Sequence, residues 1–380
     1  MIDLSRIKRN LQELSFPRRY GTNSEKLAFE KIKQKIEKLG LKTESHSFVF
    51  STFYSNVLLK IYVILVFIIL FLKYINVTDV IFILFLGIVI FLSFLLFLIS
   101  RNPEKIKFGN KLSSQNLLIK LNSEAEIGNK KEKKKKLIFI AHVDSKGQTL
   151  PIIYRILSYY AWMISVLFLI ILFFLRFFLQ IQFFLLFHSI ASVIMVINLI
   201  SCIFILINMS NNNSDGALDN ATGIAIVLEL LHHFQIEKVQ SKNYEYWFLF
   251  TGAEEVGTMG ARFFLNSLQK YDKNEFIIIN FDAIGKGINL FKFGEEKNDF
   301  LKFINLIFKS ARDYNLEIKK GRKIIGVHSD GWISAKKGFN GIGFGDISVY
   351  KYVHRKHTID NIDYELLCNF CRVIASAIYQ

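Results

Sequence analysis

Cysteine is scarce in this sequence, with three residues in 380. Cys202 lies within a long apolar stretch, and Cys368 and Cys371 form a CxxC motif near the C-terminus. A zinc site made of cysteines usually needs a second CxxC motif, and the sequence has none. We therefore expect all three cysteines to be reduced residues of helices.

A secretory signal is also missing from the start of the chain. Residues 1–40 have the pattern of a charged amphipathic helix, not that of an apolar segment followed by a cleavage site. We expect the N-terminus to remain in the cytoplasm.

Acidic residues are outnumbered by basic ones, 32 against 48, which gives a formal net charge of +16. Such an excess is typical of nucleic-acid-binding proteins, but also of membrane proteins, whose cytoplasmic loops are rich in Lys and Arg. Hydrophobic residues make up 52% of the chain and the mean hydropathy is +0.31, more than a water-soluble domain requires. The composition therefore predicts membrane segments, with a lipid bilayer as partner and no nucleic acid.

Four apolar runs are the candidate membrane segments. They are residues 53–77, Val80–Ser100, Ile156–Leu175 and Ile181–Met209. The last three lack Asp, Glu, Lys and Arg, and each can cross a hydrocarbon core of about 30 Å at about 1.5 Å per residue. The first run is interrupted by Lys60 and Lys73, whose long side chains could extend towards the lipid headgroups.

The four runs pair into two hairpins, at residues 53–100 and 153–209. Each hairpin returns the chain to the side from which it started, so residues 1–52, 101–152 and 210–380 can fold together as one domain. Basic residues such as Arg18, Arg19 and the cluster Lys130–Lys136 lie on this side, whereas the two opposite turns carry almost none. The distribution predicts a multi-pass membrane protein with this domain and both termini in the cytoplasm.

Within these soluble segments, apolar β-rich stretches alternate with helical patterns. Buried strands are predicted at Leu137–Ala141, Tyr246–Phe250, Phe276–Phe281 and Gly341–Phe344. Helices are predicted at Ala221–Phe234, Gly260–Leu268 and Tyr364–Tyr379. The expected fold class is α/β, a mixed sheet sandwiched by helices, with four transmembrane helices in two inserted hairpins.

Acidic and histidine residues lie at the ends of the predicted strands and, for Asp219, in the loop before a predicted helix. They are His142, Asp219, Glu254, Glu255, Asp282, His354 and His357. Ligands of open α/β sheets bind at the carboxyl ends of the strands, so these side chains are expected to converge on one crevice. Together they form a ligand set that suits two zinc ions.

Five segments resemble the signature blocks of metallopeptidase family 28, the co-catalytic di-zinc aminopeptidases and their carboxypeptidase relatives. They are AHVDS, SDGALDNATG, FTGAEEVGTMGARFF, NFDAIG and HTIDNID. The stretch FPRRYGTNSEKLAFEKIKQKIEKLGLKTE is also similar to the N-terminal helix of that family. The resemblance covers the soluble segments and identifies them as a zinc peptidase domain, but it does not cover the membrane runs.

The resemblance implies a role for each matched residue and two Zn2+ ions as cofactors. His142 would bind one zinc, Asp219 would bridge both, and Glu255 and Asp282 would be further ligands. Glu254 would be the general base. Asp144 would support the histidine and fix its tautomer.

Two segments depart from the family pattern. Around the last ligand the chain reads YVHRKHTIDNID, apparently one residue short, so either His354 or His357 can be the ligand. We place it at His354, because the family histidine usually follows an apolar pair such as Tyr352 and Val353, although the dipeptide HT favours His357. The other departure is Gly331, where many relatives carry a histidine.

The expected function is that of a membrane-anchored zinc exopeptidase acting on peptides. The majority of the family favours an aminopeptidase over a carboxypeptidase. A second hypothesis is a catalytically inactive peptide-binding membrane subunit with the same fold. A third is a cyclase with one zinc, which is disfavoured because every ligand position can be filled. The pattern leaves the substrate side chain and the oligomeric state open.

The short distance in sequence between two ligands and the membrane runs predicts where the site lies. His142 comes shortly before the third run and Asp219 shortly after the fourth. Because an extended chain spans at most about 3.3–3.6 Å per residue, both ligands are expected near the membrane surface. Membrane-associated peptides are therefore candidate substrates, with equal weight given to a general cytoplasmic aminopeptidase that is merely anchored.

Overall fold

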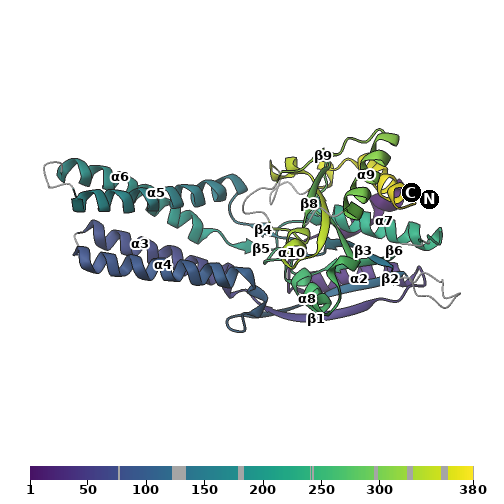
Figure 1. Cartoon of the computed structure of the whole chain (residues 1–380), viewed down its shortest axis with the longest axis horizontal. Helices are drawn as coiled ribbons and strands as arrows, with labels where there is room; N and C mark the ends of the chain where they lie inside the picture. The colour runs from purple at the N-terminus through teal and green to yellow at the C-terminus, as the bar shows by residue number, and fades with distance from the viewer. Residues whose placement is uncertain are drawn as a thin grey trace. The chain divides into compact units, whose positions relative to one another are not determined.

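The computed structural model describes residues 1–75, 78–121, 134–178, 184–239, 241, 244–294, 298–322, 328–351 and 358–379. The chain divides into two compact units (Figure 1). Unit 1 contains Met1–Phe50, Leu112–Gly147 and Asn211–Gln380, and unit 2 contains Ser51–Lys111 and Gln148–Ser210. Residues 101–111 and 148–152, assigned to the soluble domain from the sequence, group mainly with the apolar unit 2.

Unit 1 is built on a mixed sheet of eight strands within the described residues, in the order β1-β2-β6-β3-β7-β10-β8-β9. The strands are β1 (Glu44–Ser51), β2 (Lys111–Leu121), β3 (Lys135–His142), β6 (Tyr244–Thr251), β7 (Phe276–Phe281), β8 (Asn289–Phe293), β9 (Lys319–Lys320) and β10 (Asn340–Gly345). The central strands β6, β3, β7 and β10 run parallel, whereas β2 pairs antiparallel with β6 and β8 pairs antiparallel with β10. The predicted mixed α/β sheet and its four buried strands are confirmed.

The central strands are apolar on both sides because helices cover both faces of the sheet. On β3, Leu137 and Phe139 belong to one hydrophobic cluster, while Ile138 and Ile140 belong to another on the opposite face. This alternation follows from the two-residue repeat of a strand. All four side chains have no exposed surface, so the strand is held firmly where it ends at His142.

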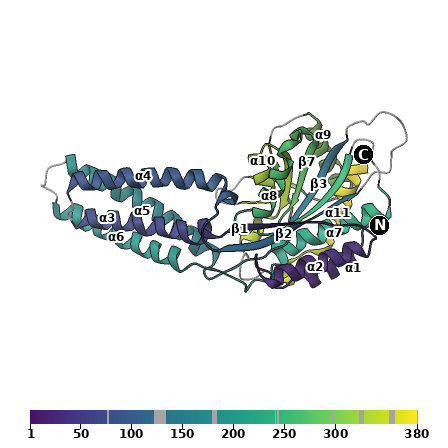
Figure 2. The ribbon, with the colours of Figure 1, turned by 90° about the horizontal axis from the view of Figure 1, so that it is seen from below.

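Helices form a layer on each face of the sheet, as Figures 1 and 2 show. One face is covered by α1 (Leu4–Leu14), α2 (Asn23–Glu37), α7 (Thr222–Ile236), α9 (Asn298–Asp313) and α11 (Tyr364–Tyr379). The other is covered by α8 (Met259–Ser267) and α10 (Asp330–Lys336). The predicted helices correspond to α7, α8 and α11. Cys368 and Cys371 are buried and free on α11, as expected.

The N-terminal segment forms two helices, where the sequence analysis expected one. The break between α1 and α2 contains Pro17, whose ring disfavours a helix interior, and Gly21, which has φ +69°. Thr22 then caps α2, because its side-chain oxygen accepts a hydrogen bond from Glu25 N at 3.3 Å. The break brings Arg18 into the interior of unit 1, with no exposed surface.

Unit 2 contains four helical segments that are long and apolar enough to cross a membrane, within the part of the chain that the structure describes. They are a π-helical turn (Tyr54–Leu58) continued by α3 (Leu59–Tyr74), then α4 (Asp79–Arg101), α5 (Ile152–Phe178) and α6 (Phe184–Ile207). These agree with the four predicted runs, although residues 76, 77 and 181–183 of those runs lie outside the described residues. Cys202 is buried and free on α6.

The lysines of α3 bind protein groups, whereas the sequence suggested that they extend to lipid headgroups. Lys60 Nζ donates to the carbonyl oxygen of Leu206 at 2.7 Å, and Lys73 forms an ion pair with Asp79. A polar pair also links α6 to α5, where Asn198 Nδ2 donates to Ser165 Oγ at 2.7 Å. A short two-stranded sheet, β4 (Gly147–Gln148) with β5 (Ser210–Asn211), lies where the chain passes between the units.

Candidate metal centre

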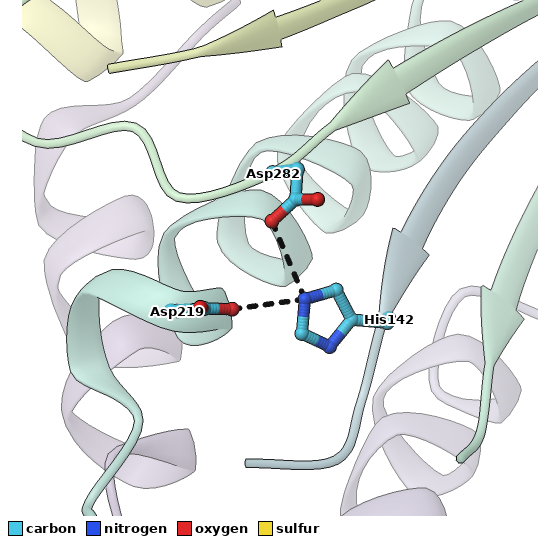
Figure 3. A group of neighbouring side chains, drawn as sticks. All are labelled: His142, Asp219 and Asp282. Carbon is cyan, nitrogen blue, oxygen red and sulfur yellow. Dashed lines mark hydrogen bonds and ion pairs between the residues drawn. The ribbon is translucent and has the colours of Figure 1, made fainter. Parts of the chain in front are cut away.

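Three of the predicted ligands converge at the carboxyl end of the sheet (Figure 3). His142 closes β3, Asp282 follows β7, and Asp219 lies in the irregular turn before α7. His142 Nε2 is 2.9 Å from Asp219 Oδ1 and 3.4 Å from Asp282 Oδ1. One donor atom from each residue lies within 4.8 Å of the other two, a spacing that one metal ion can bridge.

The sheet and one asparagine account for this convergence. Strands β3 and β7 are parallel neighbours, so His142 and Asp282 emerge at the same edge. Asn220 attaches the Asp219 turn to that edge: its Nδ2 donates to Phe281 O at 2.8 Å, and its Oδ1 accepts from Ala283 N at 3.2 Å. The peptide bond between Asp219 and Asn220 is cis.

Asp144 supports the site in two ways. Its backbone oxygen lies 3.0 Å from His142 Nδ1, so a proton on Nδ1 is donated there and Nε2 is left as the electron-pair donor. Its carboxylate accepts hydrogen bonds from Glu254 N at 2.9 Å and Glu255 N at 3.1 Å. The predicted orientation of the imidazole therefore comes mainly from the backbone of Asp144, while its side chain holds the segment that carries both glutamates.

Glu254 and Glu255 lie in a tight turn after β6. Ala253 has φ +53°, and Glu254 O accepts a hydrogen bond from Gly257 N at 2.9 Å. The two carboxylates have different electrostatic surroundings. After burial, the charges of His142 and Asp282 act most strongly on the pKa of Glu254, whereas those of Asp219 and Lys146 act most strongly on the pKa of Glu255.

Burial controls the protonation of these groups. It raises the pKa of Glu254 well above its usual value, with further contributions from Asp282 and Glu255. It also raises the pKa of Glu255 to about 8 and that of Asp282 above its usual range. Burial would lower the pKa of His142, but its contacts with Asp144, Asp219 and Asp282 raise that pKa well above the usual value.

The donor set fits zinc. Glu254, Glu255, Asp219, Asp282 and Asp144 bring carboxylates close together in a buried place, where mutual repulsion disfavours full ionisation. A divalent cation would supply the missing positive charge. Imidazole nitrogen and carboxylate oxygen are ordinary zinc ligands, so His142, Asp219 and Asp282 can hold one ion, with Glu255 beside Asp219 for a second.

Two buried groups were not singled out by the sequence analysis. Arg18 was counted there as a surface charge, but its guanidinium donates to Val143 O (2.6 Å), Asp215 O (2.6 Å) and Gly216 O (2.8 Å). It thus ties the end of β3 to the turn that carries Asp219. Burial lowers the pKa of Arg18 to about 10, so it remains charged at neutral pH.

Glu25 of α2 is the second missed group. Its carboxylate accepts from Ser114 Oγ at 2.7 Å, from Gly21 N at 2.7 Å and from Ala253 N at 3.2 Å. The last contact supports the turn that carries the two glutamates. Burial, together with the charge of Asp144, raises the pKa of Glu25 to about 8.

The segment around Gly331 packs under the site. Asp330 accepts a hydrogen bond from Thr251 Oγ1, and burial raises the pKa of Asp330 to about 7. A Cβ at residue 331 would lie 2.6 Å from Phe293 Cε2. Phe293 therefore takes the space that a side chain at this position would need. The two candidates for the last ligand, His354 and His357, lie outside the described residues.

The comparisons agree with the resemblance noted in the sequence. The profile of Peptidase family M28 matches residues 201–378. No curated protein sequence was found to match the chain.

Several solved structures share the fold. An aminopeptidase from Aneurinibacillus sp. strain AM-1 has a TM-score of 0.59 and 15% identity, covering 100% of this chain and 94% of its own. The zinc aminopeptidase BSAP from Bacillus subtilis has a TM-score of 0.57 and 13% identity, covering 100% and 95%. A glutaminyl cyclase from Fimbriiglobus ruber has a TM-score of 0.56 and 14% identity, covering 99% and 95%. At these identities the likeness concerns the fold.

Proposed function

Because residues 201–378 belong to peptidase family M28, we propose that this chain is a membrane-anchored aminopeptidase that uses two zinc ions to remove N-terminal residues from peptides. The observation that carries this proposal is the convergence of His142, Asp219 and Asp282 within 4.8 Å at the carboxyl end of the sheet. The pair Glu254 and Glu255 follows the neighbouring strand β6. An inactive peptide-binding subunit would have no need of these converging metal-ligand donors.

The proposal assigns a task to each of these residues. His142, Asp219 and Asp282 would hold the first zinc, and Asp219, Glu255 and His354 would hold the second. Asp144 and Arg18 position these ligands. Zinc, when bound, supplies the Lewis acidity that makes water nucleophilic near neutral pH.

Glu254 is the proposed general base. It takes a proton from the attacking water, whose oxygen bonds to the scissile carbonyl carbon, and passes that proton to the nitrogen of the departing amine. Water is thereby added across the amide bond. Burial raises the pKa of Glu254, which suits a group that must both accept and return a proton near neutral pH.

The experiment combines metal analysis with a peptide screen. The purified full chain should contain two zinc ions, and it should cleave peptides with a free N-terminus but not the same peptides with an acetylated one. Removal of zinc by a chelator should abolish turnover, and added zinc should restore it. Cleavage of acetylated peptides only, or turnover that survives complete metal removal, would refute the proposal.

The last ligand can be decided in the same preparation. We propose His354, so His354→Ala should contain one zinc while His357→Ala retains two. Loss of one zinc only in His357→Ala would reverse the assignment.

We further propose that α3 to α6 cross a membrane and that unit 1 lies in the cytoplasm. Support comes from the apolar length of the four helices and from the basic residues of the soluble segments. The chain passes from His142 to the start of α5 at Ile152, and from the end of α6 at Ile207 to Asp219, through short segments. Membrane-associated peptides are therefore proposed substrates.

Substrate location can be tested with one peptide in two forms. A lipid-anchored version in vesicles should be cleaved faster than the soluble version by the reconstituted chain. Equal rates would favour a general cytoplasmic aminopeptidase that is merely anchored.

A further inference from the structure

One cation lies beside the candidate metal ligands and has no part in the mechanism above. Lys146 Nζ donates to Glu255 O at 2.8 Å and lies 3.7 Å from Glu255 Oε2. Its side chain is 20% exposed, so part of it is accessible to solvent beside a candidate metal ligand. Lys146 is not among the residues that the resemblance assigned.

The backbone on both sides of Lys146 is fixed. Ser145 Oγ donates to Ser214 O at 3.0 Å and accepts from Arg18 N at 3.1 Å. Gly147 is packed so closely that a Cβ there would lie 2.0 Å from Asn211 Oδ1. A lysine whose neighbours are held in this way loses little further backbone freedom when it binds a ligand.

The positive charge extends beyond Lys146. Arg262 of α8 donates from Nε to Gly257 O at 2.9 Å, in the turn that follows the two glutamates. Lys336, at the end of α10, lies over the ring of Trp332. Desolvation lowers the pKa of His328, and the charges of Lys336, Arg262 and Lys146 lower it further. Lys146 itself lies 3.7 Å from a carboxylate oxygen of Glu255, so a positive charge adjoins the acidic centre of the site.

This polarity gives a peptide one favourable orientation. An α-ammonium group is repelled by Lys146 and attracted to the carboxylates of the centre, whereas a carboxylate is attracted to Lys146. In a dipeptide, the terminal carboxylate carbon lies about 4 Å from the scissile carbonyl carbon. Lys146 lies 3.7 Å from the carboxylate of a candidate metal ligand, so it is within reach of a carboxylate one residue beyond the scissile bond.

We propose that Lys146 binds the free α-carboxylate of the residue after the scissile bond, so that dipeptides are the preferred substrates of this site. The inference rests on the proposed function and specifies its substrate class. A longer peptide has an uncharged amide at the same place and forgoes this charge-assisted hydrogen bond. Lys146 is thus a specificity-determining residue.

The binding experiment uses Leu-Leu and Leu-Leu amide as probes, titrated by calorimetry into the zinc-loaded Glu254→Gln full chain. The free acid should bind about 10- to 100-fold more tightly than the amide, as expected for one hydrogen bond to a charged group. Adding Lys146→Met should bring this ratio close to one by weakening only the free acid. Lys146→Arg should retain most of the ratio, because it keeps the charge.

Turnover in the parent chain provides the second readout. Lys146→Met should raise KM for Leu-Leu about 10-fold or more relative to its effect on KM for Leu-Leu amide, so that the preference of kcat/KM for the free acid over the amide is lost. Lys33→Met is the matched control, since Lys33 pairs with Glu37 on the exposed side of α2. Zinc content is measured in every variant, so that a loss of metal through Glu255 is distinguished from a loss of carboxylate binding.

Four results would overturn the inference. Equal affinities for acid and amide in the parent, or an unchanged ratio in Lys146→Met, would show that Lys146 does not bind the carboxylate. An equal loss of affinity for both probes in Lys146→Met would show that Lys146 acts only through Glu255. Failure to bind or cleave either probe, or any other unblocked peptide, would overturn the proposed function as well.

Discussion

The two units of the chain bury charged groups in different places. In unit 1 the interior contains charges with no exposed surface, such as Arg18 and Glu229, each held by several hydrogen bonds. In unit 2 the buried pair between α5 and α6 is neutral, Asn198 with Ser165, and the buried charge of Lys73 lies at the end of α3 in an ion pair with Asp79. The surface of unit 2 exposes large apolar side chains along every membrane-length helix, for example Ile90 at 68% and Phe168 at 56%.

The difference indicates why each unit buries the polar groups that it does. Burying a charged group costs free energy unless the group is fully paired, so buried charges are expected where they have a function. In unit 1 several of them lie around the candidate ligands. Neutral hydrogen bonds between helices suit a segment whose outer surface faces hydrocarbon. Removing buried polar groups from each unit tests the contrast between the two interiors.

The largest effect is expected from the general base. Glu254→Gln should reduce kcat by about 10²–10⁴-fold, because only the proton acceptor is lost, and zinc content should stay nearly unchanged. Glu255→Gln should lose metal as well as turnover. Steady-state kinetics and metal analysis of both variants provide the check, and full activity in both would contradict the assigned roles.

Arg18→Met should weaken zinc binding by about 10–100-fold, the usual effect of removing a group that orients ligands. It removes the donors that join Val143 O to Asp215 O and Gly216 O. Competition with a chelator measures the affinity, and circular dichroism verifies the fold. The control is Arg19→Met, since Arg19 stacks on Tyr20 instead of entering the interior. Equal zinc affinities in the two variants would remove Arg18 from the site.

Glu229→Gln should destabilise unit 1 without changing zinc affinity. Glu229 has no exposed side-chain surface and accepts from Arg6 Nε at 2.6 Å and from Asp3 N at 2.8 Å. Breaking one partner of such a buried pair costs about 3–5 kcal/mol of unfolding free energy. Urea unfolding followed by fluorescence is the measurement. Lys120→Met, which breaks the exposed pair with Glu44, should cost less than about 1 kcal/mol.

The smallest effect is expected in unit 2. Asn198→Leu removes the hydrogen bond to Ser165 and should cost about 0.6–1.7 kcal/mol, as is usual between membrane helices. Unfolding of the detergent-solubilised chain by a denaturing detergent measures it. Ser189→Ala is the control, because that hydroxyl bonds only to Leu185 O of its own helix. A cost as large as that of Glu229→Gln would remove the contrast between the units.

Local patterns were enough to predict the framework of the site. His142 and Asp282 were found because each follows a short, largely apolar run rich in residues that favour β-strands. Asp219 was found within a quoted family motif. The four apolar helices followed from composition, which determines them almost alone. The edge strands β1 and β9, with largely exposed residues, gave no such signal.

Long-range contacts could not be predicted. Arg18 and Lys146 look like ordinary surface cations in the sequence, because their partners are distant in sequence. Arg18 donates to the carbonyl oxygens of Val143 and Asp215, and Lys146 donates to that of Glu255, each more than one hundred residues away. The break between α1 and α2 was missed because helical periodicity resumes in register after Pro17. The tight turn at Glu254 depends on Asp144 and Glu25, which no local pattern connects to it.

Along the sequence, α5 and α6 lie between β3 and the two strands that pair with it, β6 and β7, and this order affects how the sheet can form during synthesis. Strand β3 lies between β6 and β7 in the sheet, and both are translated after the second apolar hairpin. About 100 residues separate His142 from the start of β6, so at about 5–20 residues per second the ribosome needs about 5–20 s to supply the neighbours of β3. Until β6 and β7 are synthesised, β3 lacks both of its neighbours in the sheet, and Glu254, Glu255 and Asp282 do not yet exist. The set of candidate ligands can therefore assemble only after the second hairpin has been translated.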